Sequence, residues 1–175
     1  MDVIKGRTVF VIGGARSGKS SFALEKAGSF PGKKAYIATA EPLDDEMKER
    51  IQRHKIERGG GWETFEEPIK MVRVLKEMGT SYNSAVIDCL TLWLSNLILG
   101  AEDPEGEIGA FLSALRDSAH PPLFVVSNEV GMGIVPDNAL SRKFRDLAGH
   151  LNRKVADIAD EVYLVTAGIP VRIKP

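Results

Sequence analysis

The segment from Gly13 to Ser20 constrains the fold of this chain more than any other. It reads Gly-Gly-Ala-Arg-Ser-Gly-Lys-Ser and fits the pattern G-x-x-x-x-G-K-[ST], in which loop amides and a helix N-terminus surround a polyphosphate. An apolar, β-branched run (8–12) precedes it and a helical segment (21–27) follows it, which is the order of elements that such a loop needs. The alternative, a glycine-rich turn without a ligand, leaves this context unexplained. The sequence therefore predicts a phosphate-binding loop.

Two side chains of this loop are candidates for more than backbone contacts. We expect Lys19 to place its ammonium on the β and γ phosphates of a nucleotide and the Ser20 hydroxyl to help hold Mg²⁺. Glycines would let the backbone approach the phosphates closely. The predicted nucleotide contacts in this loop are Gly13, Gly14, Ala15, Arg16, Ser17, Gly18, Lys19 and Ser20.

Composition limits the remaining classes of protein. The 175 residues are about the length of one domain, so we expect a single domain over 1–175. The 23 basic and 24 acidic residues create no net field to attract nucleic acid or an anionic membrane. Cys89 is the only cysteine, which excludes an intrachain disulfide and predicts a small core residue. No apolar stretch reaches the roughly 20 residues of a membrane helix, so we expect a cytoplasmic protein without a membrane span.

Apolar strands alternate with helical segments along the chain. Strands are predicted at 8–12, 33–39, 84–88, 123–127 and 161–165, and helices at 21–27, 45–58, 69–78, 90–99, 108–119 and 139–159. Asp44 or Asp45 would cap the second helix, Gly59–Gly61 would end it, and 62–68 would form a polar connection. Strand–helix alternation implies right-handed crossovers. The predicted fold is a three-layer α/β fold of the P-loop NTPase type with a mostly parallel central sheet.

Ligands of such sheets bind beyond the carboxyl ends of the strands. We therefore expect the phosphate-binding loop, Thr39–Glu41, Asp88 and Asn128–Glu129 to converge on one edge. Asp88 ends an apolar strand, where P-loop proteins place the acidic partner of their magnesium site. It could equally cap the helix that starts at Leu90, and the two roles are compatible. Ser20 and Asp88 are the predicted magnesium-site residues.

His54 is the residue most informative about the reaction. On a helix, Arg50, His54 and Arg58 are spaced i, i+4, i+8 and form one stripe, with Lys55 beside it. A neutral imidazole nitrogen can act as a nucleophile or base, and the cations could hold a phosphate group against it. The alternative is an ordinary solvated helix face with i, i+4 ion pairs. Spacing alone leaves both readings open.

The segment Asn128–Pro136 follows the fourth strand and mixes polar residues with two glycines and a terminal proline. Exposure of Met132, Ile134 and Val135 to solvent would be costly, which indicates a partner surface or a large ligand. We expect this loop to border the site. Simple turn chemistry is the alternative.

Several motifs together resemble the bifunctional adenosylcobinamide kinase/adenosylcobinamide-phosphate guanylyltransferases of cobalamin biosynthesis. The resemblance covers almost the whole chain, through the loop 13–20, Tyr36–Thr39, Asp44–Met47, Arg50–Lys55, Asn128–Pro136, Phe144–Asp146 and Ala159–Val162. It implies phosphorylation of the cobinamide hydroxyl with ATP or GTP, followed by transfer of GMP from GTP to that phosphate.

The resemblance also implies roles for individual residues. In this family the guanylyl group passes through a covalent histidine intermediate, and the matching position is His54; Lys19 would assist as the second catalytic residue. Members of the family are homotrimers with the corrinoid near subunit contacts. Nucleotide contacts beyond the loop 13–20 map onto Thr39, Ala40, Glu41, Lys55, Ile56, Glu57, Arg58, Glu66 and Asp88.

Two other functions fit parts of the sequence. A P-loop small-molecule kinase would use His54 and its arginines only as a phosphate lid and would form no covalent nucleotide. A nucleotide-dependent switch would bind a partner protein in a manner that depends on the bound nucleotide. The short loops and near-neutral charge favour the switch least.

Overall fold

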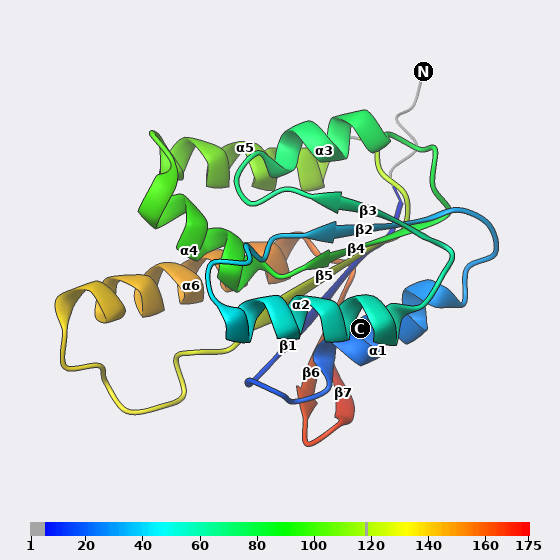
Figure 1. Cartoon of the computed structure of the whole chain (residues 1–175). Coiled ribbons are helices and arrows are strands. Elements are labelled where there is room, and N and C mark those ends of the chain that lie inside the picture. The colour runs from blue at the N-terminus through cyan, green and yellow to red at the C-terminus, as the bar shows by residue number, and fades with distance from the viewer. Residues whose placement is uncertain (1–5, 118) are drawn as a thin grey trace.

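The computed structural model describes residues 6–117 and 119–175, which form a seven-stranded sheet with helices on both faces (Figure 1). The strand order is β3-β2-β4-β5-β1-β6-β7, and all neighbours are parallel except β6 and β7. The strands are β1 (Thr8–Gly13), β2 (Lys34–Ala38), β3 (Trp62–Glu66), β4 (Ser84–Asp88), β5 (Leu123–Asn128), β6 (Glu161–Thr166) and β7 (Ile169–Lys174). The helices are α1 (Lys19–Gly28), α2 (Asp45–Arg58), α3 (Met71–Met78), α4 (Leu90–Gly100), α5 (Pro104–Asp117) and α6 (Ala139–Ile158). The predicted three-layer, mostly parallel fold is confirmed.

Each face of the sheet has its own apolar core. The larger core lies under α3, α4, α5 and α6, where Trp93 and Phe111 pack against each other with ring centroids 5.0 Å apart. On the opposite face the fully buried Ala23 and Ala27 of α1 pack on the sheet. Their short side chains let the helix backbone approach the strands closely. In the described part of the chain, no helix combines the length and apolar character that a membrane crossing needs.

The parallel strands bring the predicted ligand-binding segments to one edge, as expected. Gly13 at the end of β1 pairs with Asn128 at the end of β5, and Ala38 at the end of β2 pairs with Asp88 at the end of β4. Because β5 lies between β1 and β4, Asn128 separates the phosphate-binding loop from Asp88. The edge therefore presents polar groups from three adjacent strands.

Capping chemistry explains why α2 begins and ends where the sequence predicts. The Asp44 carboxylate accepts a hydrogen bond of 2.7 Å from the amide of Met47, which satisfies a free donor of the first turn. Gly59 has a positive φ of 68° and terminates the helix. No residue of α2 is buried. This helix lies on the same side of the sheet as α1 (Figure 1).

Three sequence predictions were wrong in their details. The segment 62–68, predicted as a polar connection, contains β3, whose alternating Trp62, Thr64 and Glu66 share one face. Beyond the five predicted strands the chain also forms β7, which pairs antiparallel with β6 and places Pro170 in an edge strand, where its missing amide is tolerated. Helix α5 begins at Pro104, before the start predicted at residue 108, and Asp103 accepts from the amide of Gly106 at 2.9 Å.

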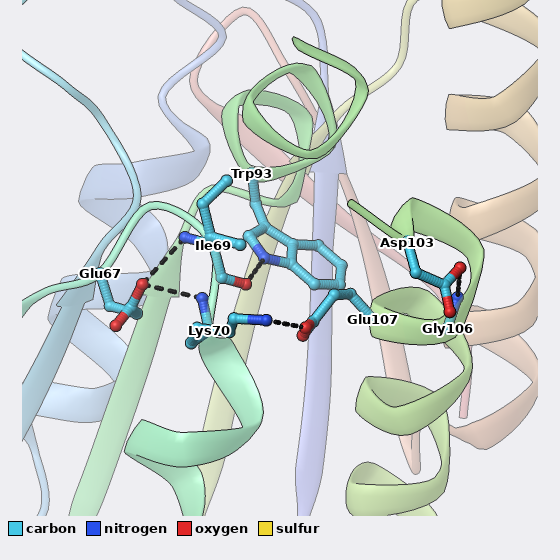
Figure 2. Close-up of polar contacts among 7 residues, drawn as sticks. All are labelled: Glu67, Ile69, Lys70, Trp93, Asp103, Gly106 and Glu107. Atoms are coloured by element: carbon cyan, nitrogen blue, oxygen red, sulfur yellow. Dashed lines mark hydrogen bonds and ion pairs between the residues drawn. The ribbon is translucent and has the colours of Figure 1, made fainter. Parts of the chain in front are cut away.

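A polar network fixes the chain where β3 leads into α3 (Figure 2). The buried Glu67 carboxylate accepts hydrogen bonds from the amides of Ile69 and Lys70, at 3.0 and 2.8 Å. The Trp93 indole donates to the Ile69 carbonyl at 2.8 Å, and Lys70 forms an ion pair of 2.6 Å with Glu107 of α5. These contacts tie the end of β3 to the larger core.

Candidate active site

Two residues of the phosphate-binding loop, Arg16 and Gly18, have positive φ angles. Gly18 precedes α1 with φ 93°, and Arg16 has φ 55°, the left-handed region that favours glycine. A Cβ at Gly13 would lie 2.4 Å from the carbonyl oxygen of Val165 and 2.7 Å from Ser17 Oγ. A side chain at position 13 is therefore excluded by its neighbours.

The turn between β6 and β7 supports the outer side of this loop. The amide of Gly168 donates a hydrogen bond of 2.8 Å to the Ser17 carbonyl. A Cβ at Gly18 would come within 3.2 Å of Gly168 Cα, so the two backbones pack directly against each other. The sequence did not predict this contact, because it depends on β7, which the sequence also did not predict.

Lys19, the predicted phosphate-binding lysine, is largely buried against the loop. The residue is only 6% exposed, and its Nζ donates to the Gly14 carbonyl at 3.1 Å. Burial lowers the pKa of Lys19, while the nearby Asp88 carboxylate acts in the opposite direction. The Lys19 ammonium thus lies within the predicted phosphate-binding loop.

Asp88 ends β4 and receives a hydrogen bond from a tyrosine on the neighbouring strand. The Tyr36 hydroxyl donates to Asp88 Oδ2 at 3.0 Å. Burial, followed by the charge of Asp88 and this hydrogen bond, raises the pKa of Tyr36 far above its usual value. The hydroxyl therefore keeps its proton and acts as a donor to the carboxylate.

Thr39 holds the residue that follows Asp88 and is itself completely buried. Its hydroxyl donates to the Cys89 carbonyl and accepts from the Cys89 amide, both at 2.8 Å. Cys89 is a small core residue, as the sequence predicts, and burial together with Asp88 raises the pKa of its thiol to about 11. In this structure the Thr39 side chain supports the site from beneath.

His54 lies across from the phosphate-binding loop. Three adjoining pockets between α2 and the body of the protein share Ser20 and His54 among their lining residues. We call the first the central pocket; its lining includes Lys19, Ser20, Tyr36, Ala40, Arg50, His54, Lys55, Arg58, Asp88 and Asn128. The second and third pockets are lined by parts of α1 and α2, and the third also by Arg16, Ser17 and Gly18. The predicted stripe Arg50, His54, Arg58 therefore faces the site.

Polar contacts attach the C-terminal half of α2 to the sheet. The Arg58 guanidinium lies over the Tyr36 ring, 4.0 Å from its centroid, and Nη2 donates to Thr64 Oγ1 at 2.8 Å. Lys55 forms an ion pair of 2.8 Å with Glu66 at the end of β3. Lys55, Arg58 and Glu66, all predicted nucleotide contacts, thus lie together.

Seven of the predicted nucleotide contacts line none of these three pockets: Gly13, Gly14, Ala15, Thr39, Glu41, Ile56 and Glu66. Ile56 is 78% exposed and lines only a shallow depression on the outer side of α2. Glu57 lines that depression as well as the two pockets beside His54. His120 is buried with its ring nitrogens against the carbonyls of Pro121 and Leu115, and His150 lies on α6 with Nδ1 2.8 Å from the Asp146 carbonyl. His54 is thus the histidine at the predicted site.

A buried network holds Asn128 in the central pocket. The backbone amide of Asn128 donates to Thr91 Oγ1 at 2.7 Å, and its backbone carbonyl accepts from Asn152 Nδ2 at 3.1 Å. Ser127 donates to Asn152 Oδ1 at 2.7 Å. Side chains from α4 and α6 thus fix the end of β5. Asn128 lines the central pocket, whereas residues 129–136 of its loop line none of the three pockets.

Sequence reasoning missed Tyr36 as a site residue. Tyr36 was predicted only as part of the strand 33–39. Residues two apart on a strand share one face. Tyr36 and Ala38 therefore point to the same side, and Ala38 pairs with Asp88. The position of Tyr36 beside Asp88 could not be predicted without the strand order, which pairs β2 with β4.

Comparison with known proteins identifies the family of this chain. A sequence model of the family described as cobinamide kinase / cobinamide phosphate guanyltransferase matches residues 9–173. The bifunctional adenosylcobalamin biosynthesis protein CobP of Pseudomonas aeruginosa is 40% identical over 167 residues, which are 94% of this chain and 95% of that protein. Its counterparts named CobU are 40% identical in Salmonella typhimurium and 36% identical in Escherichia coli, each covering 95% of this chain and 99% of the relative.

A solved structure supports the fold independently. The RadB recombinase superposes with a TM-score of 0.52 at 16% identity and covers 93% of this chain and 75% of its own. This likeness concerns the fold alone. With the family match over residues 9–173 and relatives that align over nearly their whole length, the chain belongs to the cobinamide kinase / cobinamide phosphate guanyltransferase family.

Proposed function

We propose that this protein phosphorylates the side-chain hydroxyl of adenosylcobinamide with ATP or GTP and then transfers GMP from GTP to the resulting phosphate. One observation carries the proposal: Lys19, Ser20 and Asp88 line the same pocket as His54. A phosphate-binding loop and a nucleophile that face each other can act on one bound triphosphate. The family and its bifunctional relatives supply the two reactions.

The kinase step needs the loop and an alcohol. The substrate hydroxyl attacks the γ phosphorus, the bond from that phosphorus to the bridging oxygen breaks, and the nucleoside diphosphate leaves. Lys19 and the loop amides stabilise charge on the phosphoryl oxygens. The hydroxyl gives up its proton to solvent as the new ester forms.

The guanylyl step needs His54. A neutral ring nitrogen attacks the α phosphorus of GTP, a nitrogen–phosphorus bond forms, and pyrophosphate leaves with the bridging oxygen. A phosphate oxygen of adenosylcobinamide phosphate then attacks the same phosphorus, which forms adenosylcobinamide-GDP and restores the histidine. Arg50 and Arg58, on the His54 face of α2, offset charge on the α phosphate.

The donor set of the site fits a magnesium ion. Ser20 contributes a hydroxyl at the start of α1 and Asp88 a carboxylate at the end of β4, and both line the central pocket. Hard oxygen ligands of this kind suit Mg²⁺, which keeps several waters beside substrate phosphates. When bound, the ion would neutralise charge on the triphosphate. Ser20 and Asp88 are the residues that would hold it.

Covalent labelling tests the proposal directly. Wild-type protein incubated with α-labelled GTP and Mg²⁺ should form a protein adduct that is labile in acid and stable in base, and His54→Ala should abolish it. His150→Ala is the matched control, because His150 lies on α6 outside these pockets. Addition of adenosylcobinamide phosphate should discharge the label. A wild-type protein that transfers γ phosphate but never forms the adduct would instead be a simple P-loop kinase.

We also propose a cytoplasmic homotrimer. Met132, Ile134 and Val135 of the loop after β5 are 81%, 97% and 62% exposed, and apolar side chains gathered on one loop are typical of a partner surface. Sedimentation equilibrium should give three times the chain mass, and Ile134→Asp should shift the distribution toward monomer. A monomer at micromolar concentration would contradict the trimer.

A further inference from the structure

We infer that Tyr36 is a positioning residue that links the carboxylate of Asp88 to the helix that carries His54. The inference rests on the proposed function for the roles of Asp88 and His54. Tyr36 contacts one of them through its hydroxyl and the helix of the other through its ring. Two different parts of one side chain thus serve two parts of the site.

The hydroxyl fixes the rotation of Asp88. Tyr36 Oη lies 3.0 Å from Asp88 Oδ2, and a hydrogen bond to an ionised acceptor is among the stronger and more directional ones. With Oδ2 engaged, Oδ1 faces a set direction. Phenylalanine at position 36 would keep the ring and free the carboxylate to rotate.

The aromatic ring of Tyr36 contacts α2 through Arg58. The guanidinium lies 4.0 Å from the ring centroid, and its Nη2 donates to Thr64 at 2.8 Å. Planar guanidinium groups stack on aromatic rings, whereas a lysine ammonium lacks both the plane and the fork of donors. The Trp62 ring packs edge-on with the Tyr36 ring, with centroids 6.4 Å apart and an angle of 86° between the ring planes.

These contacts matter because α2 contributes little buried apolar surface: Met47 and Ile51, which line the central pocket, are only half-buried. No residue of the helix is buried, so its orientation depends on contacts such as Arg58 with Tyr36 and Lys55 with Glu66. His54 lies one helical turn before Arg58 and takes its position from the same turn. The chain of contacts therefore runs from Asp88 through Tyr36 and Arg58 to His54.

Three variants separate the two contacts. Tyr36→Phe removes only the hydroxyl, and Tyr36→Leu removes both the hydroxyl and the ring. Arg58→Lys removes the stacked guanidinium together with its hydrogen bond to Thr64. Tyr82→Phe is the control, since Tyr82 packs on Phe65 and is absent from the linings of the pockets around His54. The first readout is calorimetric binding of a non-hydrolysable GTP analogue in Mg²⁺ and in EDTA. The second is deuterium exchange of the amides of residues 45–58 in the free protein.

Tyr36→Phe should reduce the gain in affinity that Mg²⁺ provides by about tenfold, as expected for one charge-assisted hydrogen bond, and leave exchange in α2 unchanged. Arg58→Lys should speed exchange in α2 about threefold or more, as loss of the stacking contact and of the hydrogen bond to Thr64 predicts, and preserve the effect of Mg²⁺. Tyr36→Leu should show both changes. The inference is overturned if Tyr36→Phe leaves the effect of Mg²⁺ intact, or if Tyr36→Leu leaves exchange in α2 intact.

The proposed function can fail separately from this inference. A wild-type protein without a GMP adduct would contradict the role of His54, yet the exchange comparison would still measure the link between Tyr36 and α2. If the adduct forms, Tyr36→Phe should raise the Mg²⁺ concentration needed for half-maximal adduct formation. The same variant should restore the wild-type adduct level at saturating Mg²⁺.

Discussion

Thr39 and Cys89 are joined by two hydrogen bonds of 2.8 Å, in which the threonine hydroxyl donates to the cysteine carbonyl and accepts from its amide. Thr39→Val keeps the shape of the side chain but leaves both backbone groups of a buried residue without this partner. We expect it to lower the free energy of unfolding by about 1 to 3 kcal/mol. Thr39→Ser, which retains the hydroxyl, should lose less. Urea denaturation followed by circular dichroism measures both, and equal losses in the two variants would contradict this account.

Gly13 and Gly14 are adjacent but differ in the space around them. A Cβ at Gly13 would collide with the Val165 carbonyl and Ser17, whereas nothing lies within 4 Å of a Cβ at Gly14. Gly13→Ala should therefore destabilise the protein by about 1 to 3 kcal/mol, as overpacking does, and weaken nucleotide binding. Gly14→Ala should change stability by less than about 0.5 kcal/mol. Thermal unfolding without nucleotide compares the pair, and equal stability would show that the loop backbone can shift to accept a methyl group.

Glu67 should make the stability of the fold depend on pH. Burial acts to raise its pKa, but the hydrogen bonds from Ile69, Lys70 and Arg73 outweigh it, and the pKa of the folded protein is lowered. A carboxyl group with a lowered pKa stabilises the fold above its unfolded value of about 4.3, and this contribution is lost as pH falls through the folded value.

Glu67→Gln should therefore be less stable than wild type by about 1 kcal/mol at pH 7, and the difference should shrink below about pH 4. Urea unfolding at several pH values gives the comparison. Glu77→Gln is the control, because Glu77 is exposed and lies 3.9 Å from the same arginine. A gap between Glu67→Gln and wild type that stays constant down to pH 3 would refute this role.

Lys174 caps the last long helix from the end of the chain. Its Nζ donates to the carbonyls of Ala156, Asp157 and Ala159 at 2.8, 3.0 and 2.7 Å, where the helix dipole favours a positive charge. Lys174→Met retains the aliphatic stem and should cost about 1 to 2 kcal/mol. Lys154→Met, on the exposed side of the same helix, should be nearly neutral. Chemical denaturation distinguishes them, and a neutral Lys174→Met would contradict the capping role.

Local chemistry explains which elements the sequence predicts well. The helix that carries His54 runs from Asp45 to Arg58 as expected, because its start depends on the Asp44 cap and its end on Gly59. The strand before the phosphate-binding loop is likewise recognisable from its own residues. In both cases the signals lie within a few positions of the boundary.

Long-range pairing explains what the sequence did not predict. Residues 62–66 are only half buried and form a strand because β2 offers them a partner, and 169–174 form one because β6 does. The contact of Arg58 with Tyr36 depends on two such facts at once, the strand order and the placement of α2. Neither the strand order nor the placement of α2 can be predicted from the residues of α2 alone. A tyrosine on the face of Asp88 was visible only after the register of β2 and β4 was known.

Because no residue of α2 is buried, this helix contributes little to the stability of the fold, although it carries His54. Since none of its residues belongs to either core, substitutions on this helix can alter reactivity while leaving the folding equilibrium almost untouched. Selection could therefore adjust His54, the proposed nucleophile, and its neighbouring cations without first securing extra stability elsewhere. For protein engineers, α2 is accordingly a segment in which side chains beside the pocket can be varied with little loss of buried apolar surface.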